Sequence, residues 1–247
     1  MKNWACSLFL YLLIPFIAKA QKDTLYVYGP GGPLSPFKEC AEKFGRQKKV
    51  VVKVTGGPES NWIDEAKRNA DVVFGGAEYM LTSFISAHPE MIAVSTRTSL
   101  YQRGAAILVR PGNPKHIQSM RDLGKKGIRI LDINGAGQLG YWEDIVSRQN
   151  LIAAVGKNIR KSFANTALGI AEWKKDRDYD AWITYISWHK NLKDITEMIV
   201  IPDELQVYRG TPIALTQKGK NNTIATDFVS YLKTGQAHRI FQKWGWR

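Results

Sequence analysis

The 247-residue chain has only two cysteines, Cys6 and Cys40, and fewer acidic than basic residues. Cys6 lies in an N-terminal apolar run, so the rest of the chain holds Cys40 alone and an internal disulfide is excluded there. Metal sites built on cysteine pairs are excluded for the same reason. Cys40 occupies an apolar position of an expected helix, which indicates a small buried side chain rather than a reactive thiol.

Long apolar runs are also absent after residue 20, so no membrane span is expected there. The first 20 residues have the three parts of a secretory signal: a positive start at Lys2, an apolar core over 4–17, and the small-x-small sequence Ala18–Ala20. We expect residues 1–20 to be a cleaved signal peptide and the exported chain to begin near Gln21, in the periplasm. An uncleaved membrane anchor is the alternative.

Acidic charge is scarce, with 22 Asp and Glu against 35 Lys and Arg, which gives a net charge of +13. Removal of Lys2 and Lys19 with the signal peptide lowers it to +11. A basic exported protein favours anionic ligands, glycans or membrane surfaces. The basic pairs at 48–49, 125–126 and 174–175 are scattered and form no stripe interleaved with aromatic residues, so nucleic acid is not an expected partner.

Apolar segments with strand character alternate with segments of helical periodicity, which predicts an α/β fold with mostly parallel sheet. Helices are expected to begin at 34, 61 and 141. Another is expected after 165 and ends near 176, and two more lie in the last 22 residues. Ser35 and Pro36 suggest an N-cap and a first helical residue for the helix from 34. Strands are expected at 24–28, 49–55, 70–76, 105–114, 128–133, 179–185, 198–202 and 207–216.

Glycine-rich loops follow four of the expected strands and lead toward helix starts. In open α/β sheets, ligands lie outside the carboxyl ends of the strands. Free N–H groups and the positive dipole end of a helix favour an anion there, and glycine lets the backbone approach it closely. Four such loops therefore favour an anionic ligand over simple turns: YGPGGP (28–33), TGGPES (55–60), FGGAE (74–78) and NGAGQLG (134–140).

The order of several motifs resembles one branch of the periplasmic solute-binding proteins, the accessory colonisation factor and antigenic adhesin-like branch, which is related to molybdate- and sulfate-binding proteins. The resemblance covers nearly all of the chain after residue 20. It is carried by YGPGGP, GPESNW (57–62), ADVVFGGAE (70–78), RGAAILVRPGNP (103–114), GAG with WED (135–144), DAWITYISW (180–188) and FQKWGW (241–246).

This resemblance implies a type II periplasmic binding protein fold, in which two α/β lobes close on a ligand cleft about two crossing hinge segments. Lobe one is expected over 21–106 and 209–247, and lobe two over 107–208, with crossings near 103–109 and 207–214. Members of the branch bind small oxyanionic acids, including phosphorylated three-carbon acids and citrate. The implied partners are a small anionic solute, an ABC transporter permease and a second copy in a homodimer.

The sequence departs from the branch at two loops on the lobe-two side of the expected cleft. A longer Ser-, Thr- and Gly-rich loop is cut to Gln138–Tyr141, and a hydroxyl-rich turn is replaced by Asn165–Gly169. Because a desolvated oxyanion needs hydrogen-bond donors, loss of the lobe-two hydroxyls is expected to alter the phosphate specificity that the resemblance implies. The lobe-one loops are kept almost whole, although Gly76 and Ala77 stand where relatives more often have alanine and serine.

The expected ligand-binding residues come from the glycine loops, the crossings and the lobe-two loops. Asn61 is equally a plain N-cap, and Glu78 is read as a helix cap. Arg103 and Arg209 would bind a carboxylate or phosphate through their forks, with an interlobe salt bridge as the alternative. Thr184 and Tyr185 end a strand where a ligand donor belongs. The full set is Gly31, Gly32, Asn61, Gly76, Ala77, Arg103, Gln138, Tyr141, Asn165, Thr166, Thr184 and Arg209.

Catalytic and metal-binding constellations are missing from the sequence. The four histidines have no metal-ligand spacing, no G-x-S-x-G elbow occurs, and GAGQLG lacks the Lys-Ser/Thr end of a P-loop. We therefore expect no enzyme, metal site or cofactor. Two functions stay open: a receptor that captures a small oxyanion or organic or phosphorylated acid, and a surface or periplasmic interaction or adhesion protein with an altered or lost ligand site.

Overall fold

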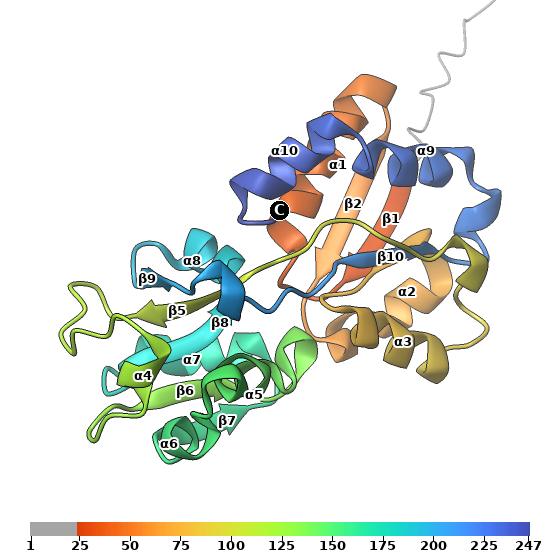
Figure 1. The fold of residues 1–247 in the computed structure, drawn as a ribbon. Helices are drawn as coiled ribbons and strands as arrows, with labels where there is room; N and C mark the ends of the chain where they lie inside the picture. Colours follow the sequence, from red (N-terminus) through yellow and green to blue (C-terminus); the bar gives the residue numbers. More distant parts are fainter. Residues whose placement is uncertain (1–23) are drawn as a thin grey trace, which may run out of the picture.

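A computed structural model describes residues 24–247, and the expected signal peptide (1–20) lies outside the described residues. The described chain forms two lobes, each built on a five-stranded sheet with helices packed against it (Figure 1). The predicted α/β class is confirmed. No helix among residues 24–247 is long and apolar enough to cross a membrane.

Lobe one contains the first and last parts of the chain, with strand order β2-β1-β3-β10-β4. Its strands are β1 (Thr24–Gly29), β2 (Val51–Gly56), β3 (Val72–Phe74), β4 (Thr98–Ser99) and β10 (Pro212–Leu215). Its helices are α1 (Leu34–Lys48), α2 (Ile63–Asn69), α3 (Glu78–Ala87), α9 (Thr223–Leu232) and α10 (Gly235–Lys243), with short 3-10 turns η1 (Glu59–Asn61), η2 (Val94–Thr96) and η6 (Gly219–Asn221).

Lobe two contains the middle of the chain, with strand order β7-β6-β8-β5-β9. Its strands are β5 (Ala105–Val109), β6 (Ile130–Ile133), β7 (Ile159–Phe163), β8 (Ala181–Tyr185) and β9 (Glu197–Val200). Its helices are α4 (Met120–Leu123), α5 (Tyr141–Val146), α6 (Ile152–Gly156), α7 (Thr166–Lys175) and α8 (Ile186–Leu192), with η3 (Ala136–Gln138), η4 (Ser147–Gln149) and η5 (Asp203–Leu205). The sequence pattern did not predict β7.

The prediction of mostly parallel sheet is wrong, because both sheets are mixed. In lobe one β1 is parallel to β2 and β3, whereas β10 is antiparallel to β3 and β4. Lobe two repeats this pattern, with β6 parallel to β7 and β8 and with β5 antiparallel to β8 and β9. The reversed strands, β5 and β10, are those through which the chain enters a lobe from its neighbour.

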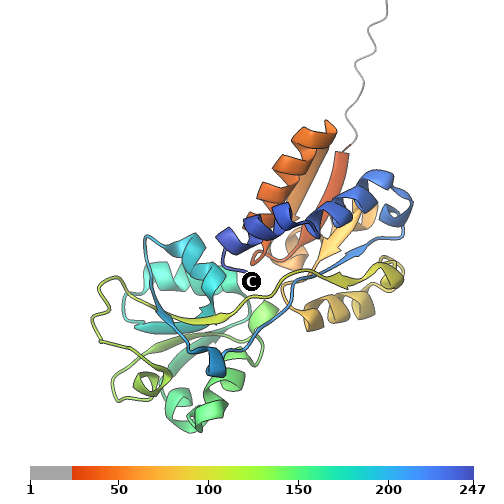
Figure 2. The ribbon, with the colours of Figure 1, turned by 45° about the horizontal axis from the view of Figure 1, so that its top comes forward.

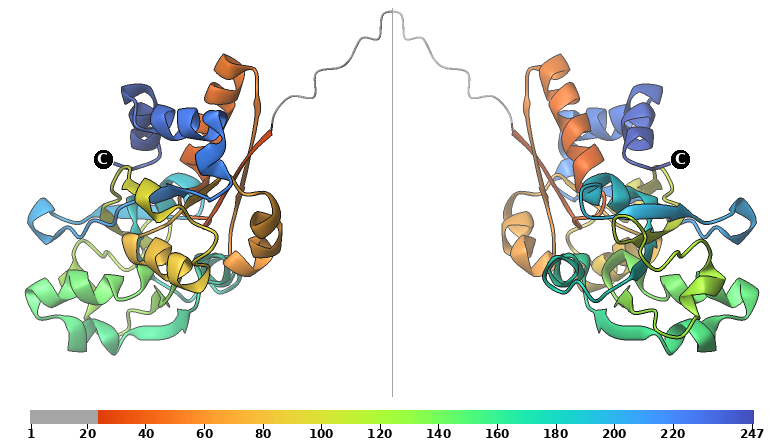
Figure 3. Two further views of the ribbon diagram at one scale, coloured as in Figure 1. Left: turned by 90° about the vertical axis from the view of Figure 1, so that its right-hand side faces the viewer. Right: turned by 90° about the vertical axis from the view of Figure 1, so that its left-hand side faces the viewer.

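Two crossing segments join the lobes and run side by side (Figure 2). They pair through Arg103 N to Arg209 O at 2.9 Å and Arg209 N to Arg103 O at 3.2 Å. The C-terminal end returns from lobe one to the same place, where Trp246 also pairs with Arg103 (Figure 3). The expected lobe boundary after residue 106 falls inside β5, and all five residues of this strand pair within the lobe-two sheet.

Side chains of β1 alternate between two apolar layers of lobe one, as the two-residue period of a strand requires. Leu25 and Val27 pack on one layer with α1, α9 and α10, and Tyr28 packs on the other, near α2 and α3. Helix α1 buries Phe37, Cys40, Ala41 and Phe44 at helical spacing, as predicted.

The start of α1 differs from the prediction. The helix begins at Leu34, its N-cap is Pro33, and no side chain caps it. Ser35 therefore lies inside the first turn, and its Oγ contacts Asn191 Oδ1 of α8 in the other lobe at 2.8 Å. The predicted Ser35 cap is wrong because the helix starts two residues earlier, directly after the glycine loop. This leaves the N–H groups of the first turn without a side-chain acceptor.

Candidate functional site

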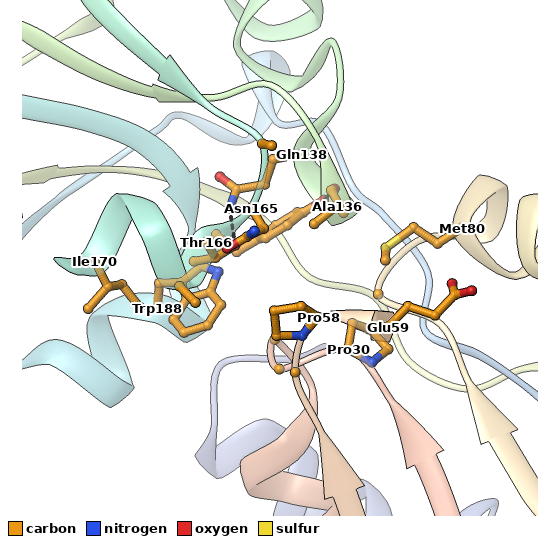
Figure 4. Close-up of a pocket in the computed structure, with 18 of the residues that line it drawn as sticks. Pro30, Pro58, Glu59, Met80, Ala136, Gln138, Asn165, Thr166, Ile170 and Trp188 are labelled. Carbon is orange, nitrogen blue, oxygen red and sulfur yellow. Dashed lines mark hydrogen bonds between the residues drawn. The ribbon is translucent and has the colours of Figure 1, made fainter. Parts of the chain in front are cut away.

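A cavity of about 370 Å³ lies between the two lobes, at the carboxyl ends of strands from both sheets (Figure 4). Its lobe-one wall comes from the loops after β1, β2 and β3, and its lobe-two wall from η3 and the starts of α7 and α8. Residues of the crossing contribute as well. The lining residues are Pro30, Gly31, Gly32, Gly57, Pro58, Glu59, Gly76, Met80, Arg103, Ala136, Gly137, Gln138, Ala164, Asn165, Thr166, Ala167, Ile170, Tyr185 and Trp188.

The YGPGGP loop brings bare backbone to the cavity beside the start of α1. A Cβ at Gly32 would lie 2.8 Å from Nη1 of Arg103, so only glycine lets the guanidinium approach without displacement. Among the hydrogen bonds of residues 24–247, none uses the backbone N–H of Gly31 or Gly32 as a donor. Two unused donors at the positive end of a 15-residue helix suit an anion.

Arg103 is the centre of the site. Its side chain is 1% exposed, although it carries a cation that cannot be deprotonated at neutral pH. Nη2 donates to the carbonyl oxygen of Gly76, and Nε is buried without a partner. Burial lowers the pKa of the guanidinium, because water no longer stabilises its charge. No salt bridge among residues 24–247 includes Arg103, so its charge has no carboxylate counterpart.

Tyr185 supports the Arg103 guanidinium from the lobe-two side. The guanidinium carbon lies 3.9 Å from the centre of the Tyr185 ring, within the range of a cation–π contact. The phenol hydroxyl donates to the carbonyl oxygen of Gly137, and burial raises the pKa of Tyr185 to about 12. The ring therefore stays neutral at physiological pH and offers its face, not a charge, to Arg103.

A second helix start faces the cavity from lobe two. Asn165 is the N-cap of α7, and its Oδ1 accepts from Leu168 N at 3.0 Å. The N–H groups of Thr166 and Ala167, in the first turn, have no intrahelical acceptor. Gln138 Nε2 donates to Thr166 Oγ1 at 3.1 Å, which ties η3 to α7 (Figure 4). The loop before α1 and the start of α7, one from each lobe, thus line the same cavity as a buried cation.

Seven of the predicted site residues meet at this cavity: Gly31, Gly32, Gly76, Arg103, Gln138, Asn165 and Thr166. Tyr185 joins them, although the sequence pointed to it only as the neighbour of Thr184 at the end of a strand. Gly76 contributes through its carbonyl oxygen, which accepts from Arg103. Gly137 faces Gly76 across the cleft, where a Cβ would lie 3.1 Å from the Gly76 oxygen.

Five predicted residues lie outside the cavity lining. Arg209 forms an ion pair with Asp144 of lobe two, as the salt-bridge alternative proposed. Tyr141 donates to Val207 O at 2.8 Å, and Thr184 is fully buried in β8. Ala77 is buried at the N-cap of α3, and Asn61 is exposed in η1.

Glu78, read as a helix cap, instead pairs with Arg97, with Oε2 2.9 Å from the guanidinium. The position of Glu78 at the start of α3 suits a helix cap and an ion pair equally well. Only the position of Arg97 in the fold distinguishes the two.

Apolar lining residues were not predicted for the site. They are Pro30, Pro58, Met80, Ile170 and Trp188. In the sequence Met80, Ile170 and Trp188 have the same periodicity as core residues, so no local signal marked them. Only the positions of the helices that carry them, relative to the cleft, show that these side chains line it. Pro30 and Pro58 lie in two of the glycine-rich loops that the sequence predicted at the ligand. Among residues 24–247, no group of three or more His, Cys, Asp or Glu could hold a metal ion.

Comparison with known sequences and structures agrees with this geometry. The family described as bacterial extracellular solute-binding protein matches residues 25–247. The chain belongs to this family. No curated protein is similar enough to match. A crystal structure of PEB3 with bound L-phospholactate is 34% identical, with a TM-score of 0.84, and the match covers 90% of this chain and 99% of that one.

Other solved structures are also similar to this solute-binding family member. Peb3 from Campylobacter jejuni is 33% identical with a TM-score of 0.82, over 90% of this chain and 99% of that one. The sulfate-binding protein SubI from Mycobacterium tuberculosis is 17% identical (TM-score 0.73; 91% and 86% covered). The molybdate-binding protein from Azotobacter vinelandii is 14% identical (0.69; 90% and 98%). The last two share the fold, which is the predicted type II periplasmic binding protein fold.

Proposed function

We propose that this solute-binding protein captures a small anionic solute, an organic or phosphorylated acid, in the cavity between its lobes. The observation that carries the proposal is Arg103, a cation 1% exposed at the cavity wall with no carboxylate partner among the described residues. A buried charge of this kind is costly unless an opposite charge meets it. The donors of Gly31, Gly32, Thr166 and Ala167 complete a site that an acid head group satisfies.

Similarity to a PEB3 structure with bound L-phospholactate supports the same ligand class. We include in the proposal export to the periplasm and delivery of the solute to an ABC transporter permease, with a homodimer as the second partner. The alternative, an interaction or adhesion protein that has lost its solute, is less well supported. An open cavity with convergent donors is what a solute receptor needs and what a lost site would not keep.

The test is a thermal-shift screen of the exported protein, refolded from denaturant to remove bound solute. The panel is L-phospholactate, phosphoglycerates, citrate, phosphate, sulfate and molybdate. A ligand at a hundredfold excess over its Kd stabilises the folded state by about 2.7 kcal/mol, so a true ligand raises the Tm clearly.

Two arginine variants then separate binding from folding. Arg103→Lys keeps the charge but loses the planar fork, and we expect it to weaken binding more than tenfold. Arg209→Lys changes a cation that lies outside the cavity and serves as the matched control. The proposal fails if no anion in the panel shifts the Tm, or if both variants bind a responding anion as tightly as the parent protein.

A further inference from the structure

Part of the cavity lining, contributed by both lobes, offers little that an anion could use. Five side chains there are apolar, and we call them the apolar wall: Pro30, Pro58, Met80, Ile170 and Trp188. Figure 4 shows Ile170 and Trp188 projecting from lobe two and Pro58, Pro30 and Met80 on the facing side. Apart from the indole N–H of Trp188, these side chains offer no hydrogen-bond donor. Water against such a wall is poorly held, and an apolar ligand group would displace it favourably.

The cavity is also larger than a three-carbon acid requires. A dry apolar cavity of about 150 Å³ in another protein accommodates benzene. The present cavity, at about 370 Å³, therefore has room for an acid head group and a group of benzene size beside it. Space of this size next to apolar side chains stays unused if the solute is lactate-sized.

Next to Met80 and Pro30, a second chamber of about 50 Å³ lies inside lobe one. The chamber shares Pro30, Gly57, Glu59 and Met80 with the main cavity. Its remaining walls are mostly apolar, from Trp62, Val73, Phe74, Leu81 and Phe84. Methionine is unbranched and adapts its shape readily, so the Met80 side chain can yield space to a bulkier ligand.

A carboxylate limits where negative charge can lie. Glu59 lines the cavity on the lobe-one side, where its Oε1 lies 2.9 Å from His88 Nε2. Its side chain is 48% exposed, so water screens a large part of this charge. A second anionic group on the ligand, as in citrate, would be repelled by this carboxylate. Negative charge on the ligand is thus favoured at Arg103 and disfavoured beside Glu59.

We infer that the solute is an acid with one anionic head group and an apolar substituent, branched aliphatic or aromatic, that packs on the apolar wall. This inference rests on the proposed function and narrows it. The head group meets Arg103 and the two helix starts, and the substituent covers Ile170, Trp188 and Pro58. Specificity for the substituent would come from the wall, and affinity for the acid from the charge.

The experiment measures Kd by calorimetry for two series with constant head groups. One series is propanoate, pentanoate and 3-phenylpropanoate; the other is methyl-, propyl- and phenylphosphonate. Burial of each methylene contributes enough free energy for about a fourfold gain in affinity. We expect the Kd to fall by about that factor per added methylene in at least one series, and to be lowest for the phenyl compound.

Variants of the wall test where the gain arises. Met80→Gln keeps the side-chain length and Ile170→Gln extends it by one atom. Both place a polar amide on the wall, so the gain per methylene should fall to about twofold or less. Leu168→Gln is the control, because Leu168 lies on the same helix, is 52% exposed and does not line the cavity. It should leave the gain unchanged. Circular dichroism of each variant confirms that it is folded.

The outcomes separate this inference from the proposed function. If L-phospholactate or another short acid binds but longer and phenyl-bearing acids bind no better, the solute-binding function stands and the apolar inference is overturned. An unchanged gain in both wall variants also overturns it. If no acid of either series and no anion of the earlier panel binds, both proposals are wrong.

Discussion

Two buried arginines show how single residues divide between structure and function. Arg110 is 7% exposed and donates to three backbone carbonyls, of Tyr179 at 2.7 Å, Trp173 at 2.9 Å and Asp176 at 2.6 Å. Its donors are satisfied within the fold. Arg103 is buried more deeply, donates to one carbonyl and keeps a buried Nε without a partner. Unsatisfied donors on a buried cation indicate a place for a ligand.

Glu143 of α5 provides a prediction at the same scale. Burial and the nearby carboxylate of Asp132 raise its pKa, and its Oε2 is buried without a partner. The folded protein thus holds this proton more tightly than the unfolded chain does. Protonated Glu143 therefore contributes to the stability of the folded state below its unfolded pKa of about 4.3. This contribution is lost as the pH rises through the raised pKa of the folded state.

We therefore expect Glu143→Gln to raise the Tm at pH 7, where the charged carboxylate is unfavourable, and to leave it unchanged near pH 3.5. The measurement is Tm against pH for both proteins. Glu42→Gln, at an exposed position of α1, is the control and should show no such dependence. Equal Tm differences at both pH values would contradict the assignment.

At the scale of elements, α7 connects a structural end to a functional one. Near its C-terminus the carbonyl oxygens of Trp173 and Asp176 accept from Arg110. At its N-terminus Asn165 accepts from only one N–H, that of Leu168, and the helix start lines the cavity. The helix is thus held firmly at the end away from the ligand and presents free donors at the other.

Asn165→Ala should lower the free energy of unfolding by about 1 kcal/mol, because it removes an N-cap. It should also weaken binding of a responding anion severalfold, since the first turn of α7 loses its alignment. Urea denaturation and calorimetry measure the two effects. Thr234→Ala removes the cap of α10 in lobe one and should lower stability without affecting binding. If both variants bind the anion equally well, the start of α7 does not contribute to the binding site.

At the scale of the whole molecule, contacts across the cleft hold the lobes near one another. Tyr79 of α3 donates to the carbonyl oxygen of Ala136 in η3, and its hydroxyl accepts from Leu139 N at 3.0 Å. Arg209 and Asp144 form an ion pair between the crossing and lobe two. The Tyr79 contacts join the two lobes directly and need them close together, so they favour the closed arrangement over an open one.

Tyr79→Phe should shift the solute-free protein toward the open arrangement, because two hydrogen bonds of the closed arrangement are lost. We expect a larger radius of gyration in X-ray scattering and a three- to tenfold weaker anion affinity. Tyr101→Phe removes a hydroxyl that bonds to Leu232 O within lobe one, at 2.9 Å, and is the control. An unchanged radius in Tyr79→Phe would show that the hydroxyl does not hold the lobes together.

The sequence by itself determined the features that depend on nearby residues. Helical spacing of Phe37, Cys40 and Phe44 predicted the buried face of α1, and the glycines after β1 and β3 predicted backbone at the cleft. Cys40 is buried as expected, and burial raises the pKa of its thiol to about 12. Arg103 was predicted at the cleft because the order of motifs located the crossing segments.

Only the tertiary structure decided which long side chains meet. Arg103 and Arg209 occupy equivalent places in the two crossings, yet one lines the cavity and the other pairs with Asp144, 65 residues away. Met80 and Ile170 have the periodicity of core residues and line the cavity because of where α3 and α7 begin. Ionic and apolar contacts between lobes depend on distances that the folded chain sets, and local patterns along the sequence do not contain those distances.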